Sequence, residues 1–285
     1  MQDPTQNEPP FTETWRVLIL VPAMNEEESL PKLFAELALR APEYEILVID
    51  DGSSDSTAQL ALAAGCALLR HPFNLGYGAA LTSGYRYALR HGYDVVVQVD
   101  ADGQHPPCEI ERLLAPIRAR EAEVVIGSRY REEEAGRNPY AGSIWRRLGA
   151  TVIASIARLW IRKPISDPTS GFQAMHRKAL ELLCHGGFPD DFPDVDVLIT
   201  MHRSGLRLLE IATPMRERFA GISMHGGFAV PFYFYRLFVV LMLLPFRRHS
   251  PYRKERQELG KKVAHQRQQL RNERKLPLPS AGEIT

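Results

Sequence analysis

The sequence has 285 residues, of which 45% are hydrophobic and 24% charged, and its formal net charge is +1, so it can form one large domain or two small ones. Its three cysteines have no metal-ligand spacing and exclude a disulfide framework, which favours a reducing compartment. The polar residues 1–14 lack a signal-peptide pattern and are expected to be disordered, and no stretch of about 20 residues is free of charge, so we expect no transmembrane helix.

Five strands are expected in the first half of the chain, because short runs of Val, Ile and Leu alternate with segments of helical spacing. These runs show no polar alternation, as in a parallel sheet that is buried on both faces. The alternation predicts an α/β fold with a mainly parallel, doubly wound sheet flanked by helices. The expected strands are residues 15–22, 45–49, 67–70, 95–99 and 123–129.

Helices are expected between these strands. For the first one, Asn25 is a plausible N-cap with Glu28 as its capping-box partner, and apolar residues follow at helical spacing from Leu30 to Leu37. Further helices are expected after the polar turn at 52–57, up to about residue 91, and over about 107–120.

The residues after the fourth strand carry the strongest chemical signal. Asp100 and Asp102 end a valine-rich run, Gln104 follows at the next alternate position, and His105 and two prolines lead into a helix. Ligands bind beyond the carboxyl ends of the strands in open α/β sheets. Hard oxygen ligands at this place suit a divalent cation that bridges substrate phosphates. The pattern therefore indicates a metal-bound diphosphate, and its alternative is a surface turn rich in turn-forming residues.

The regular alternation ends after residue 130, where the charged segment has no apolar period. In chain order we expect a loop at 131–140, a helix at 143–160, a polar turn at 166–172, an acidic segment at 189–196 leading into a helix, a strand within 206–214 and a basic loop at 216–225.

The C-terminal part is first apolar and then strongly basic. Residues 229–246 are almost wholly apolar, but about 18 residues fall just short of a hydrocarbon core roughly 30 Å thick. We expect residues 226–250 to form an interfacial helix on a membrane or in a subunit contact, and the alternative is an ordinary core helix. Residues 247–275 hold 11 Lys and Arg against 3 Asp and Glu. The basic tail, 251–285, suits an anionic membrane surface, or merely keeps the protein soluble.

Seven motifs, in this order, resemble those of family-2 glycosyltransferases of the GT-A fold. The resemblance is closest to the dolichyl-phosphate mannose synthase and polyprenyl-phosphate glycosyltransferase branch, and it extends over about residues 15–225. The motifs are VPAMNEE at 21–27, VIDDGSSDST at 48–57, NLGYGA at 74–79, DADGQHPP at 100–107, GSRY at 127–130, DPTSGF at 167–172 and RFAGIS at 218–223.

The resemblance implies a binding site for a nucleoside diphosphate sugar, with UDP or GDP as the nucleotide. Mg²⁺ or Mn²⁺ would be its cofactor. The implied roles are nucleoside contacts for Pro22, Met24, Glu26, Ile49 and Asp51, ribose and diphosphate contacts for Asp100 and Ala101, metal ligation for Asp102 and Gln104 together with Asp100, and binding of phosphate charge for Arg129 and Arg218.

An acceptor site is also implied, in the second half of the chain. Arg146, with Arg147 beside it, matches an arginine that receives the acceptor phosphate in the dolichyl-phosphate enzymes. The sequence departs from that branch at Ala150, where a serine is expected, and at Met224, where a phosphate-binding lysine is expected. Both departures concern the acceptor and leave the donor motifs intact.

The acceptor decides whether a catalytic base is needed. A lipid phosphate is already ionised at neutral pH, whereas a sugar hydroxyl needs a base, typically worth about 10²–10⁴-fold in rate. Asp191 and Asp194 lie in the acidic segment where a base could stand, and their alternative role is to cap the helix that follows.

We therefore predict a metal-dependent, inverting glycosyltransferase that transfers a hexose to a membrane-linked acceptor, in the first place a polyprenyl phosphate. The alternatives are a polysaccharide or glycolipid glycosyltransferase with an aspartate base, and a catalytically weak binding or assembly protein. Residues 15–130 would form the nucleotide-sugar half of the domain and 131–225 the acceptor half. We expect a cytoplasmic protein at the membrane surface that serves the cell envelope, is compatible with a homo-oligomer and has no nucleic-acid partner.

Overall fold

The computed structural model describes residues 15–130, 160–161, 165–185, 195–216 and 218–219. By its internal contacts the chain divides into two units, Met1–Leu244 and Pro245–Thr285, and all described residues belong to the first. Within these described ranges, no helix is long and apolar enough to span a membrane. Outside them lie the predicted tail 1–14, the loop 131–140, most of the helix 143–160, the interfacial helix 226–250 and the basic tail 251–285.

A seven-stranded sheet in the order β3-β2-β1-β4-β6-β5-β7 forms the centre of the first unit. Its neighbouring strands are parallel except where β6 lies antiparallel between β4 and β5. The strands are β1 (Val17–Ala23), β2 (Glu45–Asp50), β3 (Ala67–Arg70), β4 (Val95–Gln98), β5 (Val124–Ser128), β6 (Gln173–His176) and β7 (Leu208–Ala212).

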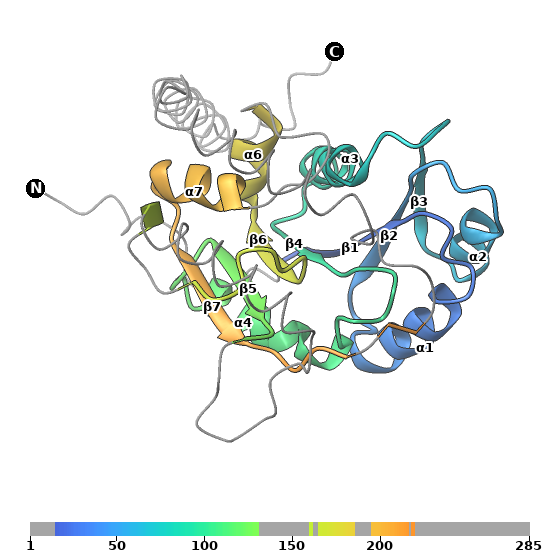
Figure 1. Cartoon of the computed structure of the whole chain (residues 1–285), viewed down its shortest axis with the longest axis horizontal. Coiled ribbons are helices and arrows are strands. Elements are labelled where there is room, and N and C mark those ends of the chain that lie inside the picture. Colours follow the sequence, from blue (N-terminus) through green and yellow to red (C-terminus); the bar gives the residue numbers. More distant parts are fainter. Residues whose placement is uncertain (1–14, 131–159, 162–164, 186–194, 217, 220–285) are drawn as a thin grey trace, which may run out of the picture. The chain divides into compact units, whose positions relative to one another are not determined.

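Helices cover both faces of this sheet, with α3, α6 and α7 on one side and α1 and α4 on the other (Figure 1). The helix α3 packs on β1 and β2 and against α6, whereas α4 packs on β5 and β6. The helices are α1 (Leu30–Arg40), α2 (Thr57–Ala63), α3 (Tyr77–Arg90), α4 (Ile110–Arg118), α6 (Arg177–His185) and α7 (Val195–Arg203), and a 3₁₀ turn, η2 (Pro107–Glu109), precedes α4.

The hydrophobic core explains why the strands read as continuous apolar runs. Every residue of β1 is buried, because helices cover the sheet on both faces. On the α4 side, Ile110, Leu113, Leu114 and Ile117 are buried at the spacing of one helix face. On the α3 side, a Cβ on Gly84 would lie 2.3 Å from Leu20 Cδ1, so only glycine lets this helix approach the sheet so closely.

The predicted α/β fold and its mainly parallel sheet are confirmed, including all five strands of the first half. The helix start was wrong: α1 begins at Leu30, with Ser29 at the N-cap position. Asn25 instead has a positive φ of 54°. Its Oδ1 accepts the Ser54 amide at 2.9 Å, so the side chain braces a neighbouring loop and does not cap a helix. The strand β6 and the helix α6 were not predicted from the sequence.

Candidate active site

The strand directions bring the polar loops of both halves to one edge of the sheet. The carboxyl ends of β1, β2, β4, β5 and β7 all meet there, because these strands are parallel. The strand β6 runs the other way, so the polar turn before it, residues 166–172, lies at the same edge. Residues that are far apart in the sequence can therefore form one site.

The loops after β1 and β2 are tied to one another. The Asn25 amide donates to Ser53 Oγ at 2.9 Å, and the Glu26 amide donates to Thr57 Oγ1 at 2.8 Å. These amides precede α1 and have no helical acceptor, so the hydroxyls of the polar turn 52–57 satisfy them. The turn thereby fixes the main chain that carries Glu26.

Ile49 and Asp51 have little exposed surface with which to contact a nucleoside. Ile49 is fully buried in the sheet. Asp51 is 5% exposed, and its carboxylate is 2.7 Å from His71 Nδ1 and accepts the Leu75 and Gly76 amides, each at 2.9 Å. Asp51 therefore holds the loop that leads into α3. A base contact by either residue stays a prediction.

The other predicted nucleoside contacts differ in how accessible they are. Pro22 and Ala101 are buried, whereas the side chain of Met24 is 42% exposed. Glu26 is half-buried, and its burial raises the pKa of its carboxyl group, with a further rise from the nearby charge of Asp102. Met24 and Glu26 are thus the two whose side chains reach the surface of the site.

Asp100 is fixed from two sides. Its Oδ1 accepts the Tyr77 hydroxyl at 2.9 Å, and its amide donates to His105 Nδ1 at 3.0 Å. Since Nδ1 accepts this hydrogen bond, Nε2 carries the ring proton, and it lies 3.6 Å from Asp100 Oδ2. The buried His105 ring stacks on Phe172 at 4.9 Å between centroids. Burial and the Asp100 charge raise the pKa of Tyr77 well above its ordinary value, so the phenol stays a donor.

Asp102 is 4% exposed and both of its oxygens have protein partners. Oδ1 accepts the Gln104 amide at 3.0 Å, and Oδ2 lies 3.0 Å from Arg218 Nη2. Burial raises the pKa of the Asp102 carboxyl, and the neighbouring Asp100 charge adds to this rise. Arg218 therefore offsets part of the repulsion between two carboxylates that are held close together.

The segment after β7, described at Arg216, Arg218 and Phe219, lies along the loop that carries these carboxylates. The Arg216 amide donates to the Gln104 carbonyl at 3.1 Å, and the Phe219 amide donates to the Asp102 carbonyl at 2.9 Å. A Cβ at Gly103, whose φ is +78°, would lie 2.1 Å from the Phe219 ring. Glycine at this position thus lets the segment dock and brings Arg218 to Asp102.

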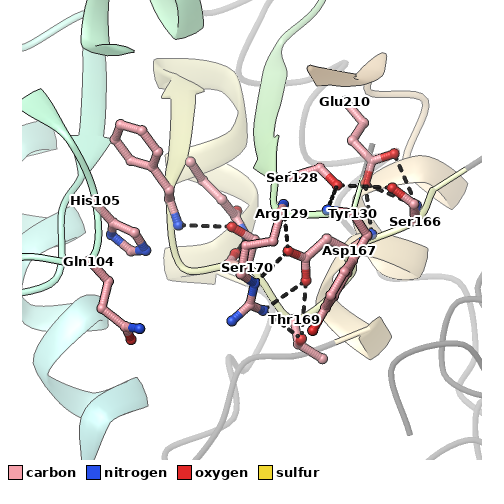
Figure 2. A network of polar contacts seen from close by, with 12 residues as sticks. Gln104, His105, Ser128, Arg129, Tyr130, Ser166, Asp167, Thr169, Ser170 and Glu210 are labelled. Atoms are coloured by element: carbon pink, nitrogen blue, oxygen red, sulfur yellow. Dashed lines mark hydrogen bonds and ion pairs between the residues drawn. The ribbon is translucent and has the colours of Figure 1, made fainter. Parts of the chain in front are cut away.

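Arg129, at the end of β5, is held by the polar turn before β6 (Figure 2). Its Nε and Nη2 donate to the two oxygens of Asp167 at 2.7 and 2.8 Å. Asp167 is fully buried, and its own amide donates to Glu210 Oε1 of β7 at 2.7 Å. The Ser166 amide donates to the same carboxylate. Three strands thus contribute to the position of one guanidinium group.

The residues present fit a hard divalent cation. Asp100, Asp102 and Gln104 offer oxygen ligands, and burial, with the neighbouring Asp100 charge, raises the pKa of Asp102, so a cation at this place would be favourable. No group of three or more His, Cys, Asp or Glu side chains in the described ranges could enclose a metal. Such a partial shell suits Mg²⁺ or Mn²⁺, which keep water and substrate phosphate as ligands. Arg218 would have to leave Asp102 Oδ2 for a cation to approach that oxygen.

Some predicted site residues lie outside the described part of the chain, and some described ones were not predicted. The possible bases Asp191 and Asp194 and the acceptor arginines Arg146 and Arg147 belong to the first group. The sequence reading missed Tyr77, Gln98, Phe219 and Glu210, because each acts through a contact distant in the chain and none belongs to a spaced set of charged residues.

Comparison with known proteins agrees with the motifs. The family model of "Glycosyl transferase family 2" matches residues 18–183. The polyprenol monophosphomannose synthase of Mycolicibacterium smegmatis is 34% identical over 224 residues, which cover 75% of this chain and 82% of that protein. The undecaprenyl-phosphate mannosyltransferase of Micrococcus luteus is 33% identical over 221 residues, 74% of this chain and 88% of that protein.

Solved structures show the same architecture. Glucosyl-3-phosphoglycerate synthase from Mycobacterium tuberculosis, in complex with Mn²⁺, uridine diphosphate and glucosyl-3-phosphoglycerate, has a TM-score of 0.60 at 21% identity. The match covers 80% of this chain and 79% of that chain. At this identity the likeness concerns the fold alone, and that fold is the GT-A fold implied by the motifs.

Proposed function

Because this chain belongs to glycosyl transferase family 2, we propose that it transfers a hexose from a nucleoside diphosphate sugar to a polyprenyl phosphate, with inversion at the anomeric carbon. The observation that carries the donor half of the proposal is the cluster at the end of β4. There Asp102 pairs with Arg218, from a loop more than 100 residues away, and Tyr77 holds the neighbouring carboxylate of Asp100. The names of the two relatives favour a mannosyl donor and a polyprenyl or undecaprenyl phosphate acceptor.

Each side chain would have a distinct task. Asp102 and Gln104, with Asp100, would hold Mg²⁺ or Mn²⁺, and this cation stabilises the charge of the leaving diphosphate when bound. Arg218 and Arg129 would add preorganised positive charge toward the same group. The acceptor oxygen attacks the anomeric carbon from the opposite face while the bond from that carbon to the diphosphate oxygen breaks.

The acceptor half of the proposal comes from the sequence. Arg146 and Arg147 would receive the lipid phosphate, which is ionised and needs no base. Under the alternative of a sugar-hydroxyl acceptor, Asp191 or Asp194 would be the base. Residues 131–225 would form the acceptor half, and the apolar and basic segments 226–285 would bring the enzyme to the membrane surface.

The donor proposal is tested by isothermal titration calorimetry with GDP and UDP, each with and without Mn²⁺. We expect the wild type to bind one nucleotide more tightly with Mn²⁺, and Asp102→Ala to lose this metal dependence. Glu43→Ala, which removes an exposed carboxylate at a distance from the site, is the control and should bind as the wild type does. Equal metal-dependent binding by wild type and Asp102→Ala would refute the assigned site.

The acceptor proposal is tested by turnover of GDP-mannose and of UDP-sugars with a short polyprenyl phosphate or an oligosaccharide. We expect product only with the lipid phosphate. Product only with the oligosaccharide would favour the alternative glycan-elongating activity. Nucleotide binding without turnover of either acceptor would favour a binding protein on this scaffold.

A further inference from the structure

Three polar side chains, outside every carboxylate motif, form a continuous chain of hydrogen bonds that ends at Asp100. The Tyr85 hydroxyl donates to Gln98 Oε1 at 3.0 Å, and Gln98 Nε2 donates to the Tyr77 oxygen at 2.7 Å. The Tyr77 hydroxyl then donates to Asp100 Oδ1 at 2.9 Å. We call Tyr85, Gln98 and Tyr77 the tyrosine relay. Tyr85 and Gln98 are 2% and 3% exposed, so bulk water is a poor substitute for these bonds.

The direction of every bond in the relay is set by the carboxylate at its end. An ionised carboxylate can only accept, so the Tyr77 hydroxyl donates to Asp100. The Tyr77 oxygen is then left to accept, and the Gln98 NH₂ group donates to it. The Gln98 oxygen therefore faces Tyr85 and accepts its hydroxyl hydrogen. With the amide held this way, the Tyr77 hydroxyl hydrogen points to Asp100.

Gly171 and His105 lie beside the other oxygen of Asp100, Oδ2. An ideal Cβ at Gly171 would lie 3.0 Å from Asp100 Oδ2 and 3.1 Å from the Tyr77 hydroxyl. Both distances are shorter than ordinary contacts. A side chain at position 171 would therefore crowd the carboxylate and the phenol where they meet, and glycine avoids this. His105 Nε2 lies 3.6 Å from Oδ2, beyond hydrogen-bond distance. Among the described residues, a strong donor therefore engages Oδ1 but not Oδ2.

We propose that Tyr77 is a positioning residue that holds Asp100 through Oδ1 and leaves Oδ2 as the oxygen available to a divalent cation. The inference rests on the proposed function, since it assumes that Asp100 takes part in cation and diphosphate binding. It assigns Gln98 the task of orienting the Tyr77 hydroxyl. Tyr85 fixes the orientation of Gln98.

The test measures Mn²⁺ affinity of the full chain by electron paramagnetic resonance of free Mn²⁺, with saturating GDP and, in parallel, UDP. Tyr77→Phe removes one oxygen atom and leaves the ring. We expect Mn²⁺ to bind about 10- to 100-fold more weakly, as for the loss of one hydrogen bond to a charged group. Thermal unfolding of the same variant, without Mn²⁺, reports its stability separately.

One control and one further variant separate positioning from stability. Tyr93→Phe removes a hydroxyl that also donates to a carboxylate, Glu45 Oε2 at 2.8 Å, away from the site. The double variant Tyr85→Phe with Gln98→Met removes the rest of the relay and keeps the Tyr77 hydroxyl. We expect Mn²⁺ affinity within about twofold of wild type in Tyr93→Phe. In the double variant we expect a loss smaller than that of Tyr77→Phe, because Tyr77 keeps its hydroxyl but loses the amide that orients it. If Tyr77→Phe alone does not fold, the triple variant, in which all three relay residues become apolar, replaces it, because removing all partners of a buried network avoids unpaired groups.

The outcomes distinguish the inference from the function on which it rests. Weaker Mn²⁺ binding in Tyr77→Phe or the triple variant, with Tyr93→Phe near wild type, supports the positioning role. Wild-type Mn²⁺ binding that Tyr77→Phe leaves unchanged would overturn the inference and leave the proposed function standing. No Mn²⁺ binding by the wild type with either nucleotide would overturn both.

Discussion

Two arginines, one at each end of β5, form ion pairs of the same fork geometry. After the strand, Arg129 donates from Nε and Nη2 to Asp167. Before it, Glu123 accepts the same two donors of Arg207 at 3.1 and 2.7 Å. The side chain of Arg129 is 21% exposed and that of Arg207 is 51% exposed. Because water competes less for the buried pair, Asp167 should fix the Arg129 guanidinium more firmly than Glu123 fixes its partner.

We predict that Asp167→Asn lowers the affinity for GDP-mannose or UDP-glucose, whichever the wild type binds, by about tenfold. The amide side chain cannot accept both guanidinium donors, so Arg129 loses its fixed orientation. Stability should fall by about 1–3 kcal/mol, because a partly buried cation loses its counter-charge. Calorimetry measures the first effect and urea unfolding the second.

Glu123→Gln is the matched control, because it breaks the same geometry at the far end of the strand. Nucleotide-sugar affinity should stay within about twofold, and stability should fall by less than about 1 kcal/mol, as for an exposed pair. Equal losses of affinity in Asp167→Asn and Glu123→Gln would mean that Arg129 acts only through overall stability.

At the scale of elements, the docking of the segment 216–219 on the loop after β4 decides whether Arg218 reaches the site. Two main-chain hydrogen bonds and the packing of Phe219 over Gly103 hold the segment. Lys32, on the neighbouring helix α1, has its Nζ 5.7 Å from the centroid of the Phe219 ring. The segment is thus placed by contacts with the loop after β4 and with α1, which precede it by more than 100 residues.

We predict that Gly103→Ala destabilises the protein by about 2–4 kcal/mol, from a left-handed backbone penalty of about 1 kcal/mol and a clash with Phe219. Gly65→Ala separates the two causes. Gly65 has a φ of +75°, and nothing lies within 4 Å of its ideal Cβ, so only the backbone penalty remains. Adding Phe219→Ala to Gly103→Ala should relieve the clash. Urea unfolding that gives equal costs for Gly103→Ala and Gly65→Ala would contradict this packing.

The sequence was most informative about elements with local signals. The strands β1 to β5 could be predicted because each is a short apolar run bounded by turn residues. The strand β6 could not, since Gln173 and His176 interrupt its pattern and its place comes from antiparallel pairing with β4 and β5. The cap at Asn25 was misread because a distant loop, through Ser54, competes for the same side chain.

At the scale of the whole molecule, the carboxyl edge of the sheet could be predicted as the site, but not the contacts within it. Asp100, Asp102 and Gln104 were found because their spacing follows one strand. Asp51 is 5% exposed and is held by His71 and two main-chain amides. These contacts depend on the loop before α3, and no local pattern in the sequence indicates them. Residue types and strand ends thus predict where chemistry occurs, while three-dimensional packing decides which atoms are available.

Membrane association is the whole-molecule property that the sequence predicts and that can be tested independently of catalysis. We predict that removal of residues 252–285 weakens flotation with anionic liposomes, because most of the basic residues in 247–275 are lost. The difference from the full chain should be large at 10 mM salt and small at 150 mM or above, since the screening length falls from about 30 to about 8 Å. Neutral liposomes are the control and should bind both proteins equally through the apolar segment 229–246. Equal flotation of both proteins with anionic liposomes at low salt would show that the basic tail only keeps the protein in solution.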